Sequence, residues 1–138
     1  MKVLVIGADG QLGSEFQKIS NSFNSLSWVF SCIKTLDLVN LNSIDTYLNK
    51  INPSFIINCA AYTSVDKAEV ESKLANTINY KAVDIISRWT SHNNKNLIHI
   101  STDYVFDGLS NIPYSENSKT NPVNEYGFSK LKGEIACM

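Results

Sequence analysis

Two residue patterns in this chain could carry chemistry, and the first lies near its end. Tyr126 and Lys130 are four residues apart, a spacing that places both side chains on one face of a helix. Reduction of a ketone needs a hydride on carbon and a proton on the developing alkoxide. A phenol can donate that proton, and a nearby ammonium favours the phenolate that remains. A hydroxyl of Ser101 or Thr102 could hold the carbonyl oxygen, so this pattern indicates carbonyl reduction.

The second pattern is a glycine-rich turn near the start of the chain. It follows the apolar run 3–6 and precedes a segment with helical spacing of apolar residues. In that context glycines permit a tight turn, and the N–H groups at the helix N-terminus bind a pyrophosphate. The expected phosphate-binding residues are Gly7, Asp9, Gly10, Gln11, Leu12 and Gly13. The spacing is Gly-x-x-Gly-x-x-Gly and not the usual Gly-x-Gly-x-x-Gly, and a glycine turn that binds nothing is the alternative.

The residues after the second expected strand bear on the choice of cofactor. A carboxylate about twenty positions beyond the glycines usually binds the ribose of NAD. Residues 30–34 contain no carboxylate, whereas Ser31 and Lys34 could accommodate a 2′-phosphate. The sequence therefore favours NADPH, with NADH as the alternative, and a solvated Lys34 is the competing interpretation of that residue.

The composition is that of a globular protein of 138 residues, with 43% hydrophobic and 18% charged residues. A formal net charge of -1 creates no field that would attract nucleic acid or an acidic membrane. No apolar run approaches the length of a membrane span. Cys32, Cys59 and Cys137 lack the spacing of a metal site or of a disulfide framework. We expect a cytoplasmic protein that binds neither nucleic acid nor membrane.

Expected strands and helices alternate along the chain. Apolar runs predict strands at 3–6, 28–30, 55–57 and 97–100, and helical spacing predicts helices at 12–23, 41–51, 74–89 and 122–135. We expect Asn42 or Ser43 to cap the second helix and Asn121 to cap the last. This alternation predicts an α/β fold: a Rossmann-like, doubly wound parallel sheet in a three-layer αβα arrangement. One NAD(P)-binding domain would span residues 1–138, with strand order 3-2-1-4 and the fourth strand at an edge.

Three further segments add specificity to these motifs: Asn58–Glu69, Ser101–Gly108 and Tyr114–Lys130. Together with the glycine turn they resemble the extended short-chain dehydrogenase/reductase family, and within it the dTDP-4-dehydrorhamnose reductases. The resemblance covers nearly the whole chain but only the amino-terminal half of such an enzyme. It implies that the full-length enzyme uses NADPH to reduce the C4 ketone of dTDP-4-dehydro-6-deoxy-L-mannose, a dTDP-sugar, to dTDP-L-rhamnose.

The resemblance also implies roles for individual residues. Thr102 would polarise the ketone, Tyr126 would donate the proton, and Lys130 would tune Tyr126 and hold the nicotinamide ribose. Asn79 matches the family's active-site asparagine. The additional cofactor-binding residues implied are Asp37, Leu38, Cys59, Ala60, Ala61 and Tyr62. The substrate-binding residues implied are Thr63, Val65, Thr102, Asp103, Tyr104 and Tyr126. Glu15 matches a carboxylate that some members use at a metal-bridged dimer contact, with an exposed helix residue as the alternative, and we expect no metal.

Members of this family have further strands and a substrate domain after the segment that this chain matches. Without them, the apolar fourth strand at 97–100 would expose its edge, so we expect the chain to self-associate. We also expect the chain alone to bind cofactor weakly and to be inactive, because the closing domain excludes water and orients the substrate.

Two other functions stay open. One is a sibling nucleotide-sugar epimerase or dehydratase with tightly held NAD, against which the segment Asp103–Phe106 argues. The other is a non-catalytic subunit similar to the regulatory subunit of methionine adenosyltransferase. Intact Thr102, Tyr126 and Lys130 favour catalysis, although that regulatory lineage can retain such residues.

Overall fold

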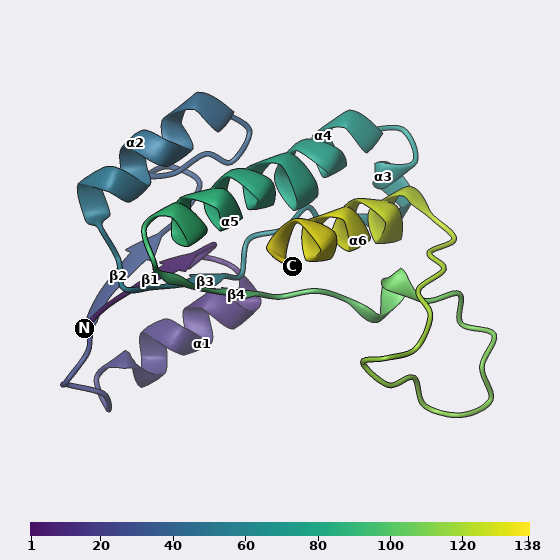
Figure 1. The fold of residues 1–138 in the computed structure, drawn as a ribbon, viewed down its shortest axis with the longest axis horizontal. Helices are drawn as coiled ribbons and strands as arrows, with labels where there is room; N and C mark the ends of the chain where they lie inside the picture. The colour runs from purple at the N-terminus through teal and green to yellow at the C-terminus, as the bar shows by residue number, and fades with distance from the viewer.

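A computed structural model describes residues 1–138, and Figure 1 shows its fold. The strands are β1 (Lys2–Ile6), β2 (Ser27–Ser31), β3 (Phe55–Asn58) and β4 (Asn96–His99). The α-helices are α1 (Gln11–Ser20), α2 (Leu41–Ile51), α3 (Val65–Ala68), α4 (Ser72–Asn76), α5 (Ala82–His92) and α6 (Glu125–Cys137). A π-helical turn, η1 (Thr77–Lys81), joins α4 to α5, and a 3-10 turn, η2 (Asp103–Val105), follows β4.

The four strands form one parallel sheet in the order β2-β1-β3-β4. In β1, Val5 lies opposite Phe30 of β2 on one side and opposite Ile57 of β3 on the other. Residues 3–6 are all buried, which explains why the sequence of β1 is continuously apolar. β4 pairs with β3 alone, so β2 and β4 are the two edges of the sheet.

The fold class is the one that the sequence predicts, but the predicted strand order, 3-2-1-4, is wrong. That order assumes that the third strand pairs beside β2, as in the usual dinucleotide fold. In the structure, residues 32–40 after β2 form turns, and the chain then enters α2 and pairs β3 with β1. The direction of strand addition reverses at this point, and right-handed crossovers therefore place α2 on the opposite face from α1 (Figure 1). The fourth strand is an edge, as expected.

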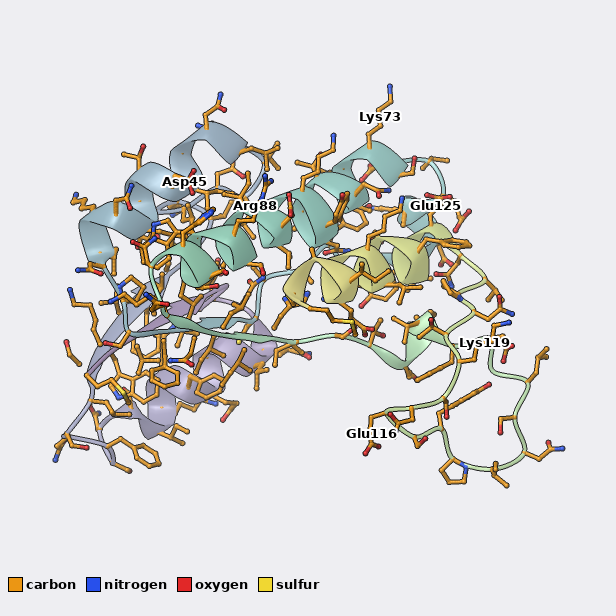
Figure 2. All side chains as sticks on the ribbon, in the orientation of Figure 1. Asp45, Lys73, Arg88, Glu116, Lys119 and Glu125 are labelled. Atoms are coloured by element: carbon orange, nitrogen blue, oxygen red, sulfur yellow. The ribbon has the colours of Figure 1, made fainter.

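Helices cover both faces of the sheet, with α1 on one side and α2, α5 and α6 on the other (Figure 1). The main core lies between the sheet and the α2–α5 layer, and its buried residues are Leu4, Ile6, Leu36, Leu38, Ile44, Leu48, Ile56, Ala82, Ile86 and Trp89. A smaller cluster of Val3, Val5 and Ile57 has Phe16 of α1 packed against it. Charged side chains such as Lys73 and Arg88 project outward from the helices (Figure 2). None of the helices combines the length and apolarity that crossing a bilayer would require.

The start of the last helix differs from the prediction. Asn121 was expected to cap it, but α6 begins at Glu125 and Asn124 is its N-cap. The Asn124 side-chain oxygen accepts a hydrogen bond from Gly127 N at 2.7 Å, which satisfies one of the open N–H groups of the first turn. The Asn121 side chain instead donates to Asp107 at 3.1 Å and so fastens the loop that precedes the helix.

Two other local features also differ from the prediction. The N-cap of α2 is Asn40, not Asn42 or Ser43, and no side chain caps that helix. The predicted helix over residues 74–89 contains the π-helical turn Thr77–Lys81. Apolar spacing alone does not reveal such a turn, because one extra residue leaves both flanking α-helical patterns intact.

Candidate active site

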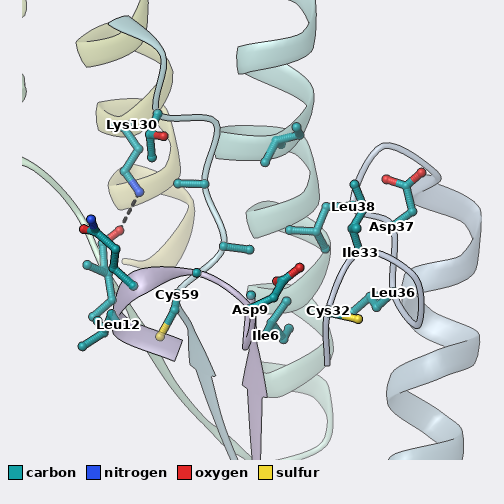
Figure 3. Close-up of a pocket in the computed structure, with 18 of the residues that line it drawn as sticks. Ile6, Asp9, Leu12, Cys32, Ile33, Leu36, Asp37, Leu38, Cys59 and Lys130 are labelled. Carbon is teal, nitrogen blue, oxygen red and sulfur yellow. Dashed lines mark hydrogen bonds between the residues drawn. The ribbon is translucent and has the colours of Figure 1, made fainter. Parts of the chain in front are cut away.

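A cavity of about 640 Å³ opens where the strands β1, β2 and β3 end, at the point where the strand order reverses. Ligands of open parallel sheets bind at such a position. The lining residues are Ile6, Gly7, Asp9, Gly10, Gln11, Leu12, Cys32, Ile33, Leu36, Asp37, Leu38, Cys59, Ala60, Ala61, Thr63, Ile78, Ile100, Ser101, Tyr126 and Lys130. Figure 3 shows Lys130 at one end and the segment 32–38 at the other, with Asp9 and Cys59 between them.

The glycine turn forms the middle of the cavity, and close approach of backbone explains two of its glycines. Gly7 has a φ of +78°, and a Cβ there would lie 2.6 Å from Ala60 N. A Cβ on Gly13 would collide with the carbonyl oxygen of Gly7. The residue at 13 must therefore be glycine for the first turn of α1 to sit against the loop. Gly13 lies beneath the turn and does not line the cavity.

The N-terminus of α1 offers unpaired donors at this turn. The backbone N–H groups of Gln11, Leu12 and Gly13 donate no hydrogen bond within the structure. No side chain caps the helix, and no acidic residue lies in its first turn. Open N–H groups and the positive end of the helix dipole together suit an anionic group such as a pyrophosphate. The residues present therefore fit a dinucleotide at this position.

Tyr126 and Lys130 both line the cavity, as their four-residue spacing on α6 predicts. Lys130 is only 1% exposed, and its Nζ donates to the carbonyl oxygen of Ile100 at 2.5 Å (dashed in Figure 3). Burial lowers the pKa of Lys130 to about 8, against the opposing influence of Glu134 and Cys137 on the same helix. The ring of Tyr126 packs edge-on against Tyr104, with 5.5 Å between ring centroids.

Asn79 lies outside the cavity and connects two of its walls. It is fully buried in the π-helical turn, where its side-chain oxygen accepts from Tyr62 N at 2.8 Å. Its side-chain nitrogen donates to Tyr62 O at 3.0 Å and to the hydroxyl of Ser129 at 2.9 Å. Asn79 therefore ties the segment after β3 to α6, next to Lys130. The structure gives this residue a positioning contact and no contact with the cavity.

The two hydroxyls considered for the carbonyl oxygen have different surroundings. Thr102 does not line the cavity: its hydroxyl donates to Asp103 Oδ1 at 3.2 Å and accepts from Tyr104 N at 3.3 Å. It thereby caps η2. Ser101 does line the cavity, and its hydroxyl donates to the carboxylate of Glu134. Of the two candidates, the structure therefore places Ser101 beside Tyr126 and Lys130.

Four other predicted site residues also lie outside the cavity lining. The hydroxyl of Tyr62 donates to Glu71 at 2.6 Å, and this bond raises the pKa of Tyr62. Val65 packs against the cluster that contains Tyr126. Asp103 and Tyr104 are exposed in η2. The remaining predicted residues, Thr63 and those of the cofactor set apart from Gly13 and Tyr62, line the cavity, and their binding roles stay predictions.

The end of the cavity at residues 32–38 is mainly apolar and departs from the expectation about Ser31. Ser31 is fully buried, and its hydroxyl bonds with that of Thr35 at 2.9 Å, so it is not free to bind a phosphate. Lys34 is exposed beside it. Asp37, which follows the region 30–34, supplies a carboxylate to the wall and accepts from Val39 N at 2.9 Å.

Several lining residues were not predicted, among them Cys32, Ile33, Leu36 and Ile78. Each is apolar or nearly so, and nothing in its type distinguishes it from a core residue. Only the position of these residues in the fold identifies them as lining residues: Cys32, Ile33 and Leu36 follow β2, and Ile78 lies in η1. That position is known only once the order of the strands is known.

The family model described as the RmlD substrate binding domain matches residues 1–138. The chain belongs to this family. A dTDP-4-dehydrorhamnose reductase of Burkholderia thailandensis is 39% identical to it over 99% of this chain and 45% of its own length.

Two solved structures are also similar. A dTDP-4-dehydrorhamnose reductase of Clostridium acetobutylicum has a TM-score of 0.94 and 36% identity, over 99% of this chain and 49% of that one. The Bacillus anthracis reductase, solved in complex with NADP, has a TM-score of 0.92 and 37% identity, over 99% and 48% respectively. The chain thus spans about half the length of the relatives that it matches.

Proposed function

We propose that this chain is the cofactor-binding and proton-donating half of a dTDP-4-dehydrorhamnose reductase, with NADPH as cofactor and dTDP-4-dehydro-6-deoxy-L-mannose as substrate. One observation carries the proposal: a single cavity joins the open N–H groups of α1 to Tyr126 and Lys130. The names of the relatives, and the NADP in the Bacillus anthracis structure, support it. NADH is the alternative cofactor. All three cysteines are free thiols, as is usual in a reducing cytoplasm, where we expect the protein to act.

Different residues of the cavity would bind the cofactor and donate the proton. The N–H groups of Gln11 and Leu12 would hold the pyrophosphate in the middle. When bound, NADPH would supply the hydride that reduces the C4 ketone. Tyr126 would give its proton to the ketone oxygen as charge develops there, which leaves a hydroxyl on the product and a phenolate on the enzyme. Lys130 in its ammonium form would stabilise that phenolate.

A binding and turnover assay tests this proposal. NADPH is titrated into the chain and its binding is followed by fluorescence. Turnover is measured with a full-length reductase that contains this chain as its amino-terminal half, by adding NADPH and the 4-keto sugar nucleotide and recording the absorbance of the reduced nicotinamide. We expect saturable binding in the wild type and in Tyr126→Phe. Any oxidation of NADPH should be lost in Tyr126→Phe, because phenylalanine has no proton to give. Absence of saturable binding would contradict the proposal.

A non-catalytic nucleotide-binding subunit is the second candidate. The observation that favours it is the hydroxyl of Thr102, which is engaged by Asp103 and Tyr104 outside the cavity. Binding of NADPH by the full-length protein with no oxidation, unchanged in Tyr126→Phe, would favour this candidate. Comparing Ser101→Ala with Thr102→Val separates the hydroxyls: loss of one donor to a developing oxyanion typically costs about 10²-fold or more in rate.

The edge of β4 is the basis of a proposed self-association. Asn96 N and Ile100 N donate toward β3, so by the two-residue period of a strand the N–H groups of Leu97 and His99 face outward. The side chains of Ile98 and Ile100 are 50% and 38% exposed. We propose that two copies of the chain associate through this edge. Light scattering coupled to size-exclusion chromatography should show a dimer that Ile98→Lys disrupts; a compact monomer at micromolar concentration would argue against it.

A further inference from the structure

His99 lies between β3 and α6, and the mechanism above gives it no part. It is the last residue of β4, and its Nδ1 is 3.2 Å from the side-chain nitrogen of Asn58. On the other side of the ring, Nε2 is 3.4 Å from Nζ of Lys130. A Cβ on Gly133 would lie 3.3 Å from the same Nε2, so the glycine leaves room for the imidazole against α6. The ring thus bridges Asn58 and Lys130.

The hydrogen bonds of Asn58 determine which nitrogen of His99 carries the proton. Asn58 is buried, and its side-chain oxygen accepts from Ala60 N at 3.2 Å. Its NH₂ group must therefore face His99 Nδ1, which has to act as the acceptor. Burial, and then the charge of Lys130, lower the pKa of His99 to about 4, so the ring is neutral at pH 7. A neutral imidazole has one N–H, and here it is on Nε2, directed at Lys130.

This arrangement discriminates between the two forms of Lys130. The ammonium form of Lys130 has only donors, so one of its N–H groups would face the N–H on Nε2 of His99, which is unfavourable. The amine form has a lone pair that can accept a hydrogen bond from that N–H. We propose that His99, oriented by Asn58, is a positioning residue for Lys130 whose ring N–H favours the uncharged amine over the ammonium. The bond from Nζ to Ile100 O is available to either form and holds the nitrogen in place.

The other ionisable groups beside Lys130 act in the opposite sense. Glu134 and Cys137, both on α6, raise the pKa of Lys130, whereas burial lowers it to about 8. Glu134 also accepts from Ser101 of the segment after β4, and Tyr126 precedes Lys130 by one turn of α6. Burial of the Lys130 side chain is therefore what offsets the carboxylate on α6.

The consequence for the reaction rests on the proposed function. After Tyr126 has given its proton to the substrate oxygen, the phenolate must be reprotonated. If Lys130 passes on one ammonium proton, an amine remains, and the N–H of His99 then hydrogen-bonds that amine until it takes a proton from water. The same Asn58 side chain also accepts from Ala60 N, in the segment after β3 that packs against Gly7.

Direct titration of Lys130 tests the proposal without cofactor or substrate. The chain is labelled with ¹³Cε-lysine, the signal of Lys130 is assigned with Lys130→Met, and its titration midpoint is measured by NMR. In Asn58→Asp the carboxylate only accepts, so His99 must place its proton on Nδ1 and turn the lone pair of Nε2 toward Lys130. We expect the midpoint to rise by about one pH unit or more. Asn93→Asp adds the same charge at the end of α5 and should leave the midpoint unchanged.

A double-mutant cycle separates the ring from the added charge. If His99 carries the effect, Asn58→Asp should shift the midpoint much less in a His99→Phe background than with His99 present. An equal shift in both backgrounds, or none in Asn58→Asp, would overturn the proposal. If Asn58→Asp does not fold by circular dichroism, Asn58→Ser removes the fixed donor and should raise the midpoint in the same direction. Failure of NADPH binding would leave this result standing, so the two proposals fail separately.

Discussion

The two ends of the cavity are held in different ways. At the α6 end, polar side chains are buried and bound by distant segments: Lys130 by Ile100 O, and Asn79 by both Tyr62 and Ser129. At the end formed by residues 32–38, the exposed Asp37 accepts from Val39 N, two residues along the chain. The polar side chains of the first end are thus fixed by tertiary contacts, and those of the second by local turns. Substitution of these polar side chains should therefore change folding and protonation at the first end, and mainly affinity at the second.

The largest effect should come from the turn on which both ends depend. Gly13→Ala would drive a Cβ into Gly7 O, and such overpacking typically costs about 1–3 kcal/mol. We expect a loss of stability at the upper end of that range in urea unfolding, together with loss of NADPH binding. Gly10→Ala is the matched control, because its Cβ would lie 3.3 Å from Gly7 O, a contact that a small shift relieves. Equal losses in the two variants would contradict the role of close packing at position 13.

The α6 end should give a pH-dependent stability. The folded-state pKa of Lys130 is about 8, below the ordinary 10.5, so between these values the unfolded chain binds more protons. Stability should rise as the pH increases through that window, by on the order of 3 kcal/mol, and be lower below it. Lys130→Met should remove this rise in urea unfolding. Lys132→Met should keep it, because Lys132 lies two residues further along α6 and is exposed. A rise retained in Lys130→Met would mean that another group titrates.

His99 should contribute a second rise, of similar size, in a lower pH window. Its folded-state pKa is about 4, below the ordinary 6.5, so the unfolded chain takes up the proton first as the pH falls. The wild type should therefore lose stability from pH 6.5 to 4 more steeply than His99→Phe does. The exposed His92 provides the control, since His92→Phe should keep the wild-type slope. Identical slopes in all three proteins would show that His99 is protonated as easily as a solvated histidine.

The same contrast explains which features the sequence predicts. Tyr126 and Lys130 share a cavity because they share a helix face, which their spacing encodes. The pairing of β3 with β1 was not predicted, because the apolar run in β3 does not specify its neighbour. Whether Ser101 or Thr102 faces the cavity depends on where β4 ends, and successive side chains in an extended segment point opposite ways. The contacts of Asn79 depend on a π-helical turn, and the burial of Ser31 depends on a turn that brings in Thr35.

The smallest effect on cofactor affinity is expected at Lys34. Its size reports how far the segment 32–38 is ordered before the cofactor binds. Lys34 is exposed and belongs to a turn, so its attraction to a 2′-phosphate would be that of a surface ion pair, at most about 1 kcal/mol. Lys34→Met should therefore weaken NADPH binding by about fivefold or less and leave NADH binding unchanged, and added salt should reduce the difference. Lys50→Met, on the exposed end of α2, controls for the change of net charge. A loss above tenfold for NADPH would mean that Lys34 is held in place before the phosphate arrives, and the two ends would then be equally preorganised.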